Sequence, residues 1–349
     1  MFDTIYLHVG SPKTGTTSIQ GSFDANRDVL ERAGWGYPSD RLHYQLMGLA
    51  GSNKRVFGPG ADDGQPIATF RSDCETWFRR ETKRLSALGV KQLIFSFEPL
   101  FAAPEPVLRE IIDRLRRKAR RIVIICYCRH PYHRWAGVYQ ERVKNGGLPG
   151  RRSKRLETGL HDSQTLEMIE SLVGPSNMIL RKFDRETLIN GDVIDDFAAA
   201  LGFAALPADF RKSTRENESL SCEAFAIARA INRRVPAKKN GLWNPARAKS
   251  LPRLLTSISG TPFVPPRRDI DRVAPLVEAE RARLKDRFGL DFAALEPPNR
   301  PALFRRKDTL DDIARIIADQ AVEIERLRAA RDRAVWRRAL RWIRRAGGA

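Results

Sequence analysis

The chain has few of the residues on which several protein classes depend. Only 4 of its 349 residues are cysteine, and their spacing matches no zinc site. We therefore expect a reduced compartment and no structural metal, with Cys126 and Cys128 packed in the core. No segment approaches the ~20 consecutive apolar residues of a membrane span. The first predicted strand begins by Thr4, too early for a signal peptide, so we expect a cytoplasmic protein.

Acidic residues are also scarce relative to basic ones. The sequence has 62 Lys and Arg against 42 Asp and Glu, a net charge of +20. This excess favours an anionic ligand, polymer or membrane surface as partner, although charge alone does not choose among them. A composition of 42% hydrophobic and 30% charged residues is typical of globular chains. No nucleic-acid-binding module is recognisable, so we expect no specific nucleic-acid partner.

Four short apolar segments predict strands of a parallel sheet covered on both faces. They are "TIYLHVG" (4–10), "QLIFSFE" (92–98), "RIVIICYCR" (121–129) and "MILRKFD" (178–184). A helix should begin near Thr16, and "PEPVLREIIDRLRRKARR" should be a crossover helix. Further helices are predicted at 132–144, 163–172, 192–201, 220–233 and 270–287. The pattern predicts an α/β domain over residues 1–300, with helices on both faces of the sheet.

Residues 308–349 have a different pattern. A heptad-like seam covers 310–327, formed by Leu310, Ile313, Ile317, Gln320, Ile324 and Leu327. The chain ends in "WRRALRWIRRAGGA", which predicts a basic amphipathic helix suited to an anionic membrane surface. The alternatives are that this helical tail packs on the domain or pairs with a second copy of the chain.

The stretch "HVGSPKTGTT" (8–17) predicts a phosphate-type anion site. A glycine-containing turn between a strand and a helix turns backbone N–H groups toward an anion. The side chains that can add a cation or hydroxyl donors are Ser11, Lys13, Thr14, Thr16, Thr17 and Ser18. In a Walker A loop the lysine follows the second glycine, whereas here Thr16 follows Gly15. The loop therefore suits a shorter charged chain without an obligatory Mg²⁺.

A second group of basic residues follows the strand at 121–129. Arg129 ends this strand, and Pro131 marks the first turn of the next helix. An arginine at the carboxyl end of a parallel strand lies where α/β folds bind ligands, and its planar fork suits a phosphate.

The two motifs together resemble those of sulfotransferases that use 3′-phosphoadenosine 5′-phosphosulfate (PAPS), bacterial members included. "SPKTGTT" resembles their 5′-phosphosulfate loop, and "RHPYHRWAGVY" is similar to their 3′-phosphate segment, R-N-P-x-D-x-x-x-S-x-Y. The resemblance covers roughly residues 1–235 and implies a P-loop-like, three-layer fold. It implies that Lys13, Gly15, Thr16 and Thr17 hold the 5′-phosphate, that Arg129 holds the 3′-phosphate, and that no metal is required.

The chain departs from the second motif, with His130 and His133 at its asparagine and aspartate positions and a further change at a binding position. Gly137 stands where the family has a serine that contacts the 3′-phosphate. This removes a hydrogen bond to a charged group, worth about 1.5–3 kcal/mol. Tyr139, Arg134 and Lys144 are the candidates to replace it.

Sulfuryl transfer needs a base to remove the proton of the acceptor. Glu98 directly follows a predicted strand, where the family has a histidine or glutamate, and is our candidate. His43 is the second candidate, as base or substrate contact, whereas His8 lies on the first strand and we expect it to be structural. The product of the donor would be 3′-phosphoadenosine 5′-phosphate (PAP).

Charge and resemblance suggest an anionic carbohydrate, glycolipid or other hydroxyl or amine acceptor. The basic loop "RVKNGGLPGRRSKR" (142–155) is a candidate rim for it, with a solvated loop as the alternative. Two other functions stay open: an ATP- and Mg²⁺-dependent kinase, and a non-catalytic basic protein that binds membranes or polyanions through a degenerate loop.

Overall fold

The computed structural model describes residues 1–39, 43–51, 66–147, 159–213, 219–239, 242–244, 247–248 and 250–294, and scattered residues between 309 and 330. The chain divides into two compact units. The first comprises Met1–Glu141, Pro149–Asn217 and Pro265–Pro298, and the second comprises Arg142–Leu148, Glu218–Val264 and Asn299–Ala349. The predicted domain boundary near residue 300 stays a prediction.

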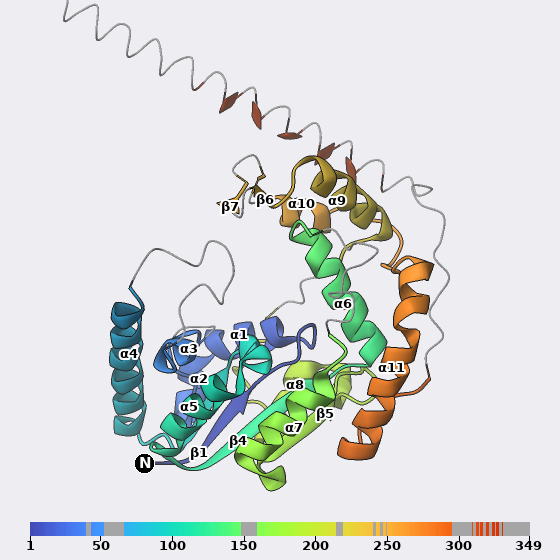
Figure 1. The fold of residues 1–349 in the computed structure, drawn as a ribbon. Coiled ribbons are helices and arrows are strands. Elements are labelled where there is room, and N and C mark those ends of the chain that lie inside the picture. The colour runs from blue at the N-terminus through green and yellow to red at the C-terminus, as the bar shows by residue number, and fades with distance from the viewer. Residues whose placement is uncertain are drawn as a thin grey trace, which may run out of the picture. The chain divides into compact units, whose positions relative to one another are not determined.

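A five-stranded parallel sheet forms the centre of the first unit (Figure 1). Its strands are β1 (Phe2–His8), β2 (Trp35–Gly36), β3 (Gln92–Ser96), β4 (Ala119–Cys128) and β5 (Met178–Lys182). They lie in the order β2-β3-β1-β4-β5, and each neighbouring pair is parallel. The predicted parallel sheet is therefore confirmed, and the short edge strand β2 adds to it.

Helices cover both faces of this sheet. The helices of the first unit are α1 (Thr16–Ala25), α2 (Arg27–Arg32), α3 (Gln45–Leu49), α4 (Ile67–Ala87), α5 (Glu105–Arg116), α6 (Pro131–Lys144, of which the last three residues belong to the second unit), α7 (Asp162–Val173), α8 (Val193–Leu201) and α11 (Arg267–Phe288). Short 3₁₀ turns occur at η2 (Glu98–Ala102), η4 (Pro175–Asn177) and η5 (Ile189–Gly191). One face packs against α3, α4, α5 and α7, and the other against α1, α2 and α8. This is the three-layer α/β arrangement that the sequence predicts.

The alternation of buried side chains along the strands explains the two layers. In β3, Leu93 and Phe95 belong to the core under α4 and α5, whereas Ile94 belongs to the core under α1 and α8. Both sets are fully buried because helices cover both faces. The strands therefore appear as continuous apolar runs.

The parallel strands bring three segments to one edge of the sheet. β1 leads into the glycine loop (residues 10–17), β3 into Glu98, and β4 into Arg129 and α6. These three strands are neighbours in the sheet, in the order β3-β1-β4. Segments far apart in sequence thus meet at the carboxyl edge, where α/β folds place their ligands.

The second unit is small and mainly helical in its described part. It contains α9 (Cys222–Arg234), the short pair β6 (Lys238–Lys239) and β7 (Leu242–Trp243), and α10 (Leu251–Thr256). The described residues between 309 and 330 are helical, with the side chains of Ile324 and Leu327 exposed. Of the other residues of the predicted heptad seam, Ile313 is half-buried and Gln320 is exposed. Leu310, Ile317, the terminal basic helix and residues 148–155 of the basic loop lie outside the described residues. In the described part of the chain, no helix is sufficiently long and apolar to cross a membrane.

Candidate functional site

The glycine loop joins β1 to α1 and contains two residues with left-handed backbone. Lys13 has φ 71° and Gly15, at the N-cap of α1, has φ 77°. A β-carbon at Gly15 would lie 2.9 Å from Val193 Cγ1, so this position also lacks space for a side chain. A left-handed residue other than glycine costs about 1–2 kcal/mol. Left-handed backbone of this kind occurs in anion-binding nests, where successive N–H groups converge.

A cluster of buried polar side chains anchors the start of the glycine loop. The hydroxyl of Ser11 donates to Asp162 at 2.9 Å and accepts from Arg134 Nε at 2.6 Å. All three side chains are buried, and burial raises the pKa of Asp162. Within the loop, the hydroxyl of Thr14 donates to the Ser11 carbonyl at 2.5 Å. The hydroxyls of Ser11 and Thr14 therefore hold the loop in shape, and the ligand contacts predicted for them stay predictions.

Two buried polar atoms behind the loop have no partner among the described residues. They are the hydroxyl oxygen of Thr16 and Nε2 of His8. A β-carbon built on Gly10 would lie 2.6 Å from Thr16 Oγ1 and 3.3 Å from His8 Nε2. Both atoms thus face the same small region, and only a glycine fits between them. An unpaired buried hydroxyl is costly, and the ligand contact expected of Thr16 stays a prediction.

His8 itself is fully buried and neutral. Its Nδ1 bonds the hydroxyl of Ser96 on the neighbouring strand β3 at 2.8 Å. Burial lowers the pKa of His8 to about 3. This position agrees with the structural role expected of His8 on the first strand. The other ring nitrogen of His8, Nε2, faces the loop.

Arg129 is the cation that approaches the loop from β4. Its Nη1 donates to the backbone carbonyl of Lys13 at 3.3 Å, and its guanidinium lies 5.9 Å from the centre of the Phe183 ring. No carboxylate in the described part of the chain pairs with it. Burial without a counter-ion lowers the pKa of Arg129. An anion bound beside Lys13 would supply the missing charge.

The side chain of Lys13 runs along α6. A β-carbon at Gly137 would lie 3.0 Å from Lys13 Cγ, and Lys13 Nζ lies 2.8 Å from Glu141 Oε2. Gly137 therefore gives space to the lysine stem. Tyr139, Arg134 and Lys144 are the candidates to replace the hydrogen bond of the family's serine to the 3′-phosphate. Two of them have partners within the protein: Arg134 contacts Ser11, and the hydroxyl of Tyr139 donates to Asp269 at 2.7 Å. The third, Lys144, belongs to the second unit.

Glu98 is the first residue of η2 and lies at the same edge of the sheet as the loop. His8 of β1 is in register with Ser96 of β3, and the N–H of Phe97 donates to the His8 carbonyl at 3.0 Å. Gly10 and Glu98 each lie two residues beyond this register pair. Glu98, a half-buried residue, therefore lies level with the start of the loop along the sheet. Thr17 and Ser18 follow in the first turn of α1, with Thr17 exposed.

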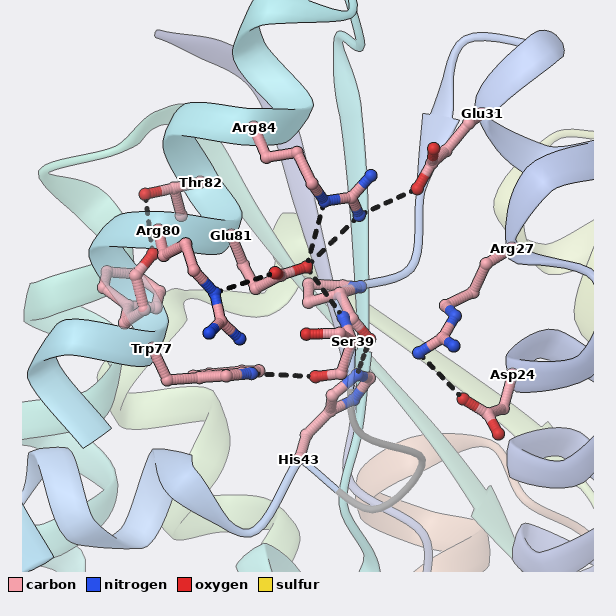
Figure 2. Close-up of polar contacts among 12 residues, drawn as sticks. Asp24, Arg27, Glu31, Ser39, His43, Trp77, Arg80, Glu81, Thr82 and Arg84 are labelled. Carbon is pink, nitrogen blue, oxygen red and sulfur yellow. Dashed lines mark hydrogen bonds and ion pairs between the residues drawn. The ribbon is translucent and has the colours of Figure 1, made fainter. Parts of the chain in front are cut away.

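His43 lies in a different environment, within a polar network beside α4 (Figure 2). Its Nδ1 accepts a hydrogen bond from the N–H of Ser96 at 3.0 Å, and its Nε2 contacts the Pro38 carbonyl at 3.0 Å. The side chain is fully buried and its backbone is left-handed, at φ 47°. Because both ring nitrogens bond the backbone, the ring is held as a neutral structural element. A catalytic role for His43 stays an untested prediction, and the geometry gives it no support.

A surface pocket of about 380 Å³ lies beside the same network, at the end of α1 away from the loop. Its charged lining residues are Asp24, Arg27, Asp28, Glu31 and Arg84. The cations in it are paired: Arg27 with Asp24 at 3.3 Å, and Arg84 with Glu31 at 2.8 Å. Both arginines of this pocket thus have a carboxylate partner, which Arg129 lacks among the described residues.

Sequence reasoning missed Glu141 and Asp162, which contact Lys13 and Ser11. Glu141 could have been found, because it lies one helical turn after Gly137 in the second motif. No local signal marks Asp162, which is 151 residues from Ser11. In the described part of the chain, no group of three or more His, Cys, Asp or Glu side chains is placed to hold a metal ion.

The solved structures similar to this chain include two sulfotransferases. A sulfotransferase from Alicyclobacillus acidocaldarius is 14% identical, with a TM-score of 0.43 and coverage of 82% of this chain and 96% of that one. The sulfotransferase domain from the curacin biosynthetic pathway is 12% identical, with a TM-score of 0.39 and coverage of 78% and 98%. No family model and no curated protein matches. Because both TM-scores lie below 0.5, we base the function on the residues of this chain.

Proposed function

We propose that the protein is a sulfotransferase that binds PAPS at the glycine loop and transfers its sulfuryl group to a hydroxyl or amine. The main support is Arg129, a part-buried guanidinium that bonds the Lys13 carbonyl and has no carboxylate partner among the described residues. Together with Lys13, it provides two cations at one sheet edge. Two cations suit a ligand with two anionic groups, as PAPS has.

The residues of the loop fit the 5′ end of such a ligand. The buried hydroxyl of Thr16 has no partner in the described part of the chain, and Lys13 and Gly15 have the backbone of an anion nest. Lys13 would stabilise the charge that develops on the leaving phosphate. Thr16 occupies the position of the Walker A lysine, which favours this function over an ATP-dependent kinase.

Glu98 is the proposed base. It would accept the proton of the acceptor while the sulfuryl group moves in line from the donor. Its support is its place, at the end of the strand beside β1. The Glu98→Gln variant should lose at least about tenfold in turnover, the lower range for positioned proton transfer, and keep its affinity for PAP. Normal turnover would remove Glu98 from this role.

The acceptor is proposed from charge and resemblance only: an anionic carbohydrate or glycolipid that the basic protein meets in the cytoplasm. Contact of the tail with a membrane surface and pairing of chains through 310–327 are further proposals. Both rest on the sequence pattern of this segment.

A thermal-shift comparison tests the proposed function. PAP should raise the melting temperature, and a ligand at 100 times its Kd stabilises by about 2.7 kcal/mol. ATP with Mg²⁺ should raise it less. A shift with ATP and Mg²⁺ but none with PAP would favour the kinase, and a shift with neither would favour the non-catalytic function. Transfer of labelled sulfate from PAPS to anionic oligosaccharides then tests the acceptor class.

A further inference from the structure

The ammonium of Lys13 and the carboxylate of Glu141 form an ion pair inside the proposed site. The lysine stem crosses α6 at Gly137, and Nζ lies 2.8 Å from Glu141 Oε2 one turn further along the helix. Gly137 and Glu141 are four residues apart and so share a face of α6. A larger residue at 137 would meet the stem, so the glycine and the carboxylate together define its path.

This carboxylate is an unexpected neighbour for a cation that must hold an anion. It repels an anionic ligand and offers Lys13 an alternative partner. The side chains of Lys13 and Glu141 are 21% and 34% exposed, so solvent partly screens their attraction, although Oε2 of Glu141 itself is buried. This oxygen makes no hydrogen bond of good geometry with the described residues, so the contact is an ion pair that a ligand anion can replace. Arg129 has no such partner among the described residues. The two cations of the site therefore differ: one has a competing carboxylate within the protein, and the other does not.

We infer that Glu141 competes with the bound nucleotide for the ammonium of Lys13 and thereby weakens the hold on the product. This inference rests on the proposed function. In the transfer, the bond between sulfur and the bridging oxygen breaks and leaves its electron pair on the 5′-phosphate. A new bond joins sulfur to the acceptor oxygen, whose proton goes to Glu98. The product phosphate thus carries more negative charge beside Lys13 than the donor did, and a carboxylate that takes the ammonium back favours release.

The Glu141→Gln variant tests this competition against a matched control. Asp113→Asn removes the same charge from an exposed pair with Arg116, near the end of α5 that precedes β4, at the opposite edge of the sheet. PAP affinity is measured by titration calorimetry, and PAP release by stopped flow. Glu141→Gln should bind PAP about five- to tenfold more tightly and release it more slowly, with a lower KM for PAPS. Asp113→Asn should change these values less than twofold.

The opposite results overturn the inference. If Glu141 instead positions Lys13 for the reaction, Glu141→Gln will bind PAP no better and lose turnover. If Asp113→Asn gained as much PAP affinity as Glu141→Gln, the gain would come from the change in net charge and not from the Glu141 carboxylate. Because the Glu141 side chain is part-exposed, the variant should fold, and an unchanged melting temperature without ligand verifies this.

Inorganic pyrophosphate separates this inference from the proposed function, because it needs the loop but no nucleoside. If the natural chain binds no PAP but Glu141→Gln binds pyrophosphate more tightly, the proposed function fails and the competition stands. If PAP binds the natural chain and neither ligand binds more tightly to the variant, the competition fails and the function stands. If pyrophosphate binds neither protein, PAP decides, and an equal PAP affinity in the natural chain and in Glu141→Gln would then overturn the inference.

Discussion

The glycine loop and the polar network around Ser39 lie in the same unit, but they differ in how their polar groups are bonded. In the Ser39 network (Glu31, Ser39, Trp77, Glu81 and Arg84), Glu81 accepts from the N–H of Ser39 and pairs with Arg84, which also pairs with Glu31. Trp77 donates to the Ser39 carbonyl at 2.9 Å. Burial opposes the charge of Glu81, yet the bonds from Ser39 and Arg84 bring its pKa below the ordinary value.

The loop contains the opposite arrangement. Among the described residues, the hydroxyl of Thr16 and Nε2 of His8 have no partner, and Arg129 has no counter-ion. Burial alone therefore does not distinguish a site from a structural cluster, because both regions bury polar groups. The two regions differ in the groups left without partners, which the native fold tolerates only at a cost in stability. Mutations should thus affect stability in one region and binding in the other.

Arg129→Met should give the largest effect on binding. It removes the proposed anchor of the 3′-phosphate, and a charge-assisted hydrogen bond of about 1.5–3 kcal/mol corresponds to a roughly 10–100-fold loss of PAP affinity. The free energy of unfolding should stay the same or rise, because the variant removes a part-buried charge that has no counter-ion among the described residues. Calorimetry with PAP and urea denaturation measure the two quantities. A large loss of stability with unchanged affinity would place Arg129 among the structural residues.

The glycine loop and Arg129 could be predicted from the sequence, whereas helix α4 and the contacts between distant residues could not. The loop and Arg129 were found because each lies in a short motif next to an apolar strand. The 21-residue helix α4 was missed although its buried Phe70, Cys74 and Trp77 have helical spacing, since charged residues separate them. The contact of Arg134 with Ser11 joins residues 123 positions apart, and His43 bonds Ser96 53 positions away. Such contacts follow from the packing of the sheet, and no local pattern indicates them.

Glu81→Gln tests the other side of the comparison. The amide can still accept from Ser39, but Arg84 loses a charged partner in a part-buried place. Loss of a hydrogen bond between charged groups should lower the free energy of unfolding by about 1.5–3 kcal/mol. Urea denaturation measures it, with PAP affinity as the second reading. An effect on PAP affinity greater than twofold would mean that the network supports the binding site.

Thr16→Val tests the loop side of the comparison with the Ser39 network. Threonine and valine side chains have nearly the same shape, so the substitution changes little besides the hydroxyl. The variant removes a buried hydroxyl that has no partner among the described residues, so stability should rise by about 1 kcal/mol. The same change should lower PAP affinity about tenfold, since the ligand loses a donor. Ser22→Ala is a useful control, because Ser22 lies in the same helix α1 as Thr16 and its hydroxyl already bonds Ser213, which lies outside that helix. It should lower stability slightly and leave binding unchanged, whereas a loss of stability in Thr16→Val would show that this hydroxyl is satisfied within the fold.

Gly137→Ala should have the smallest effect and tests why a glycine occupies this position. Alanine favours the helix by up to about 1 kcal/mol over glycine, but its β-carbon would lie 3.0 Å from Lys13 Cγ. The flexible lysine stem can shift by a few tenths of an ångström, so PAP affinity should fall only two- to fivefold. The same substitution in a Lys13→Ala chain has no stem to displace, and there it should raise the free energy of unfolding by more than in the natural chain. Equal stabilisation in both chains would mean that Gly137 makes no space for Lys13, and the link between this glycine and the Glu141 ion pair would be lost.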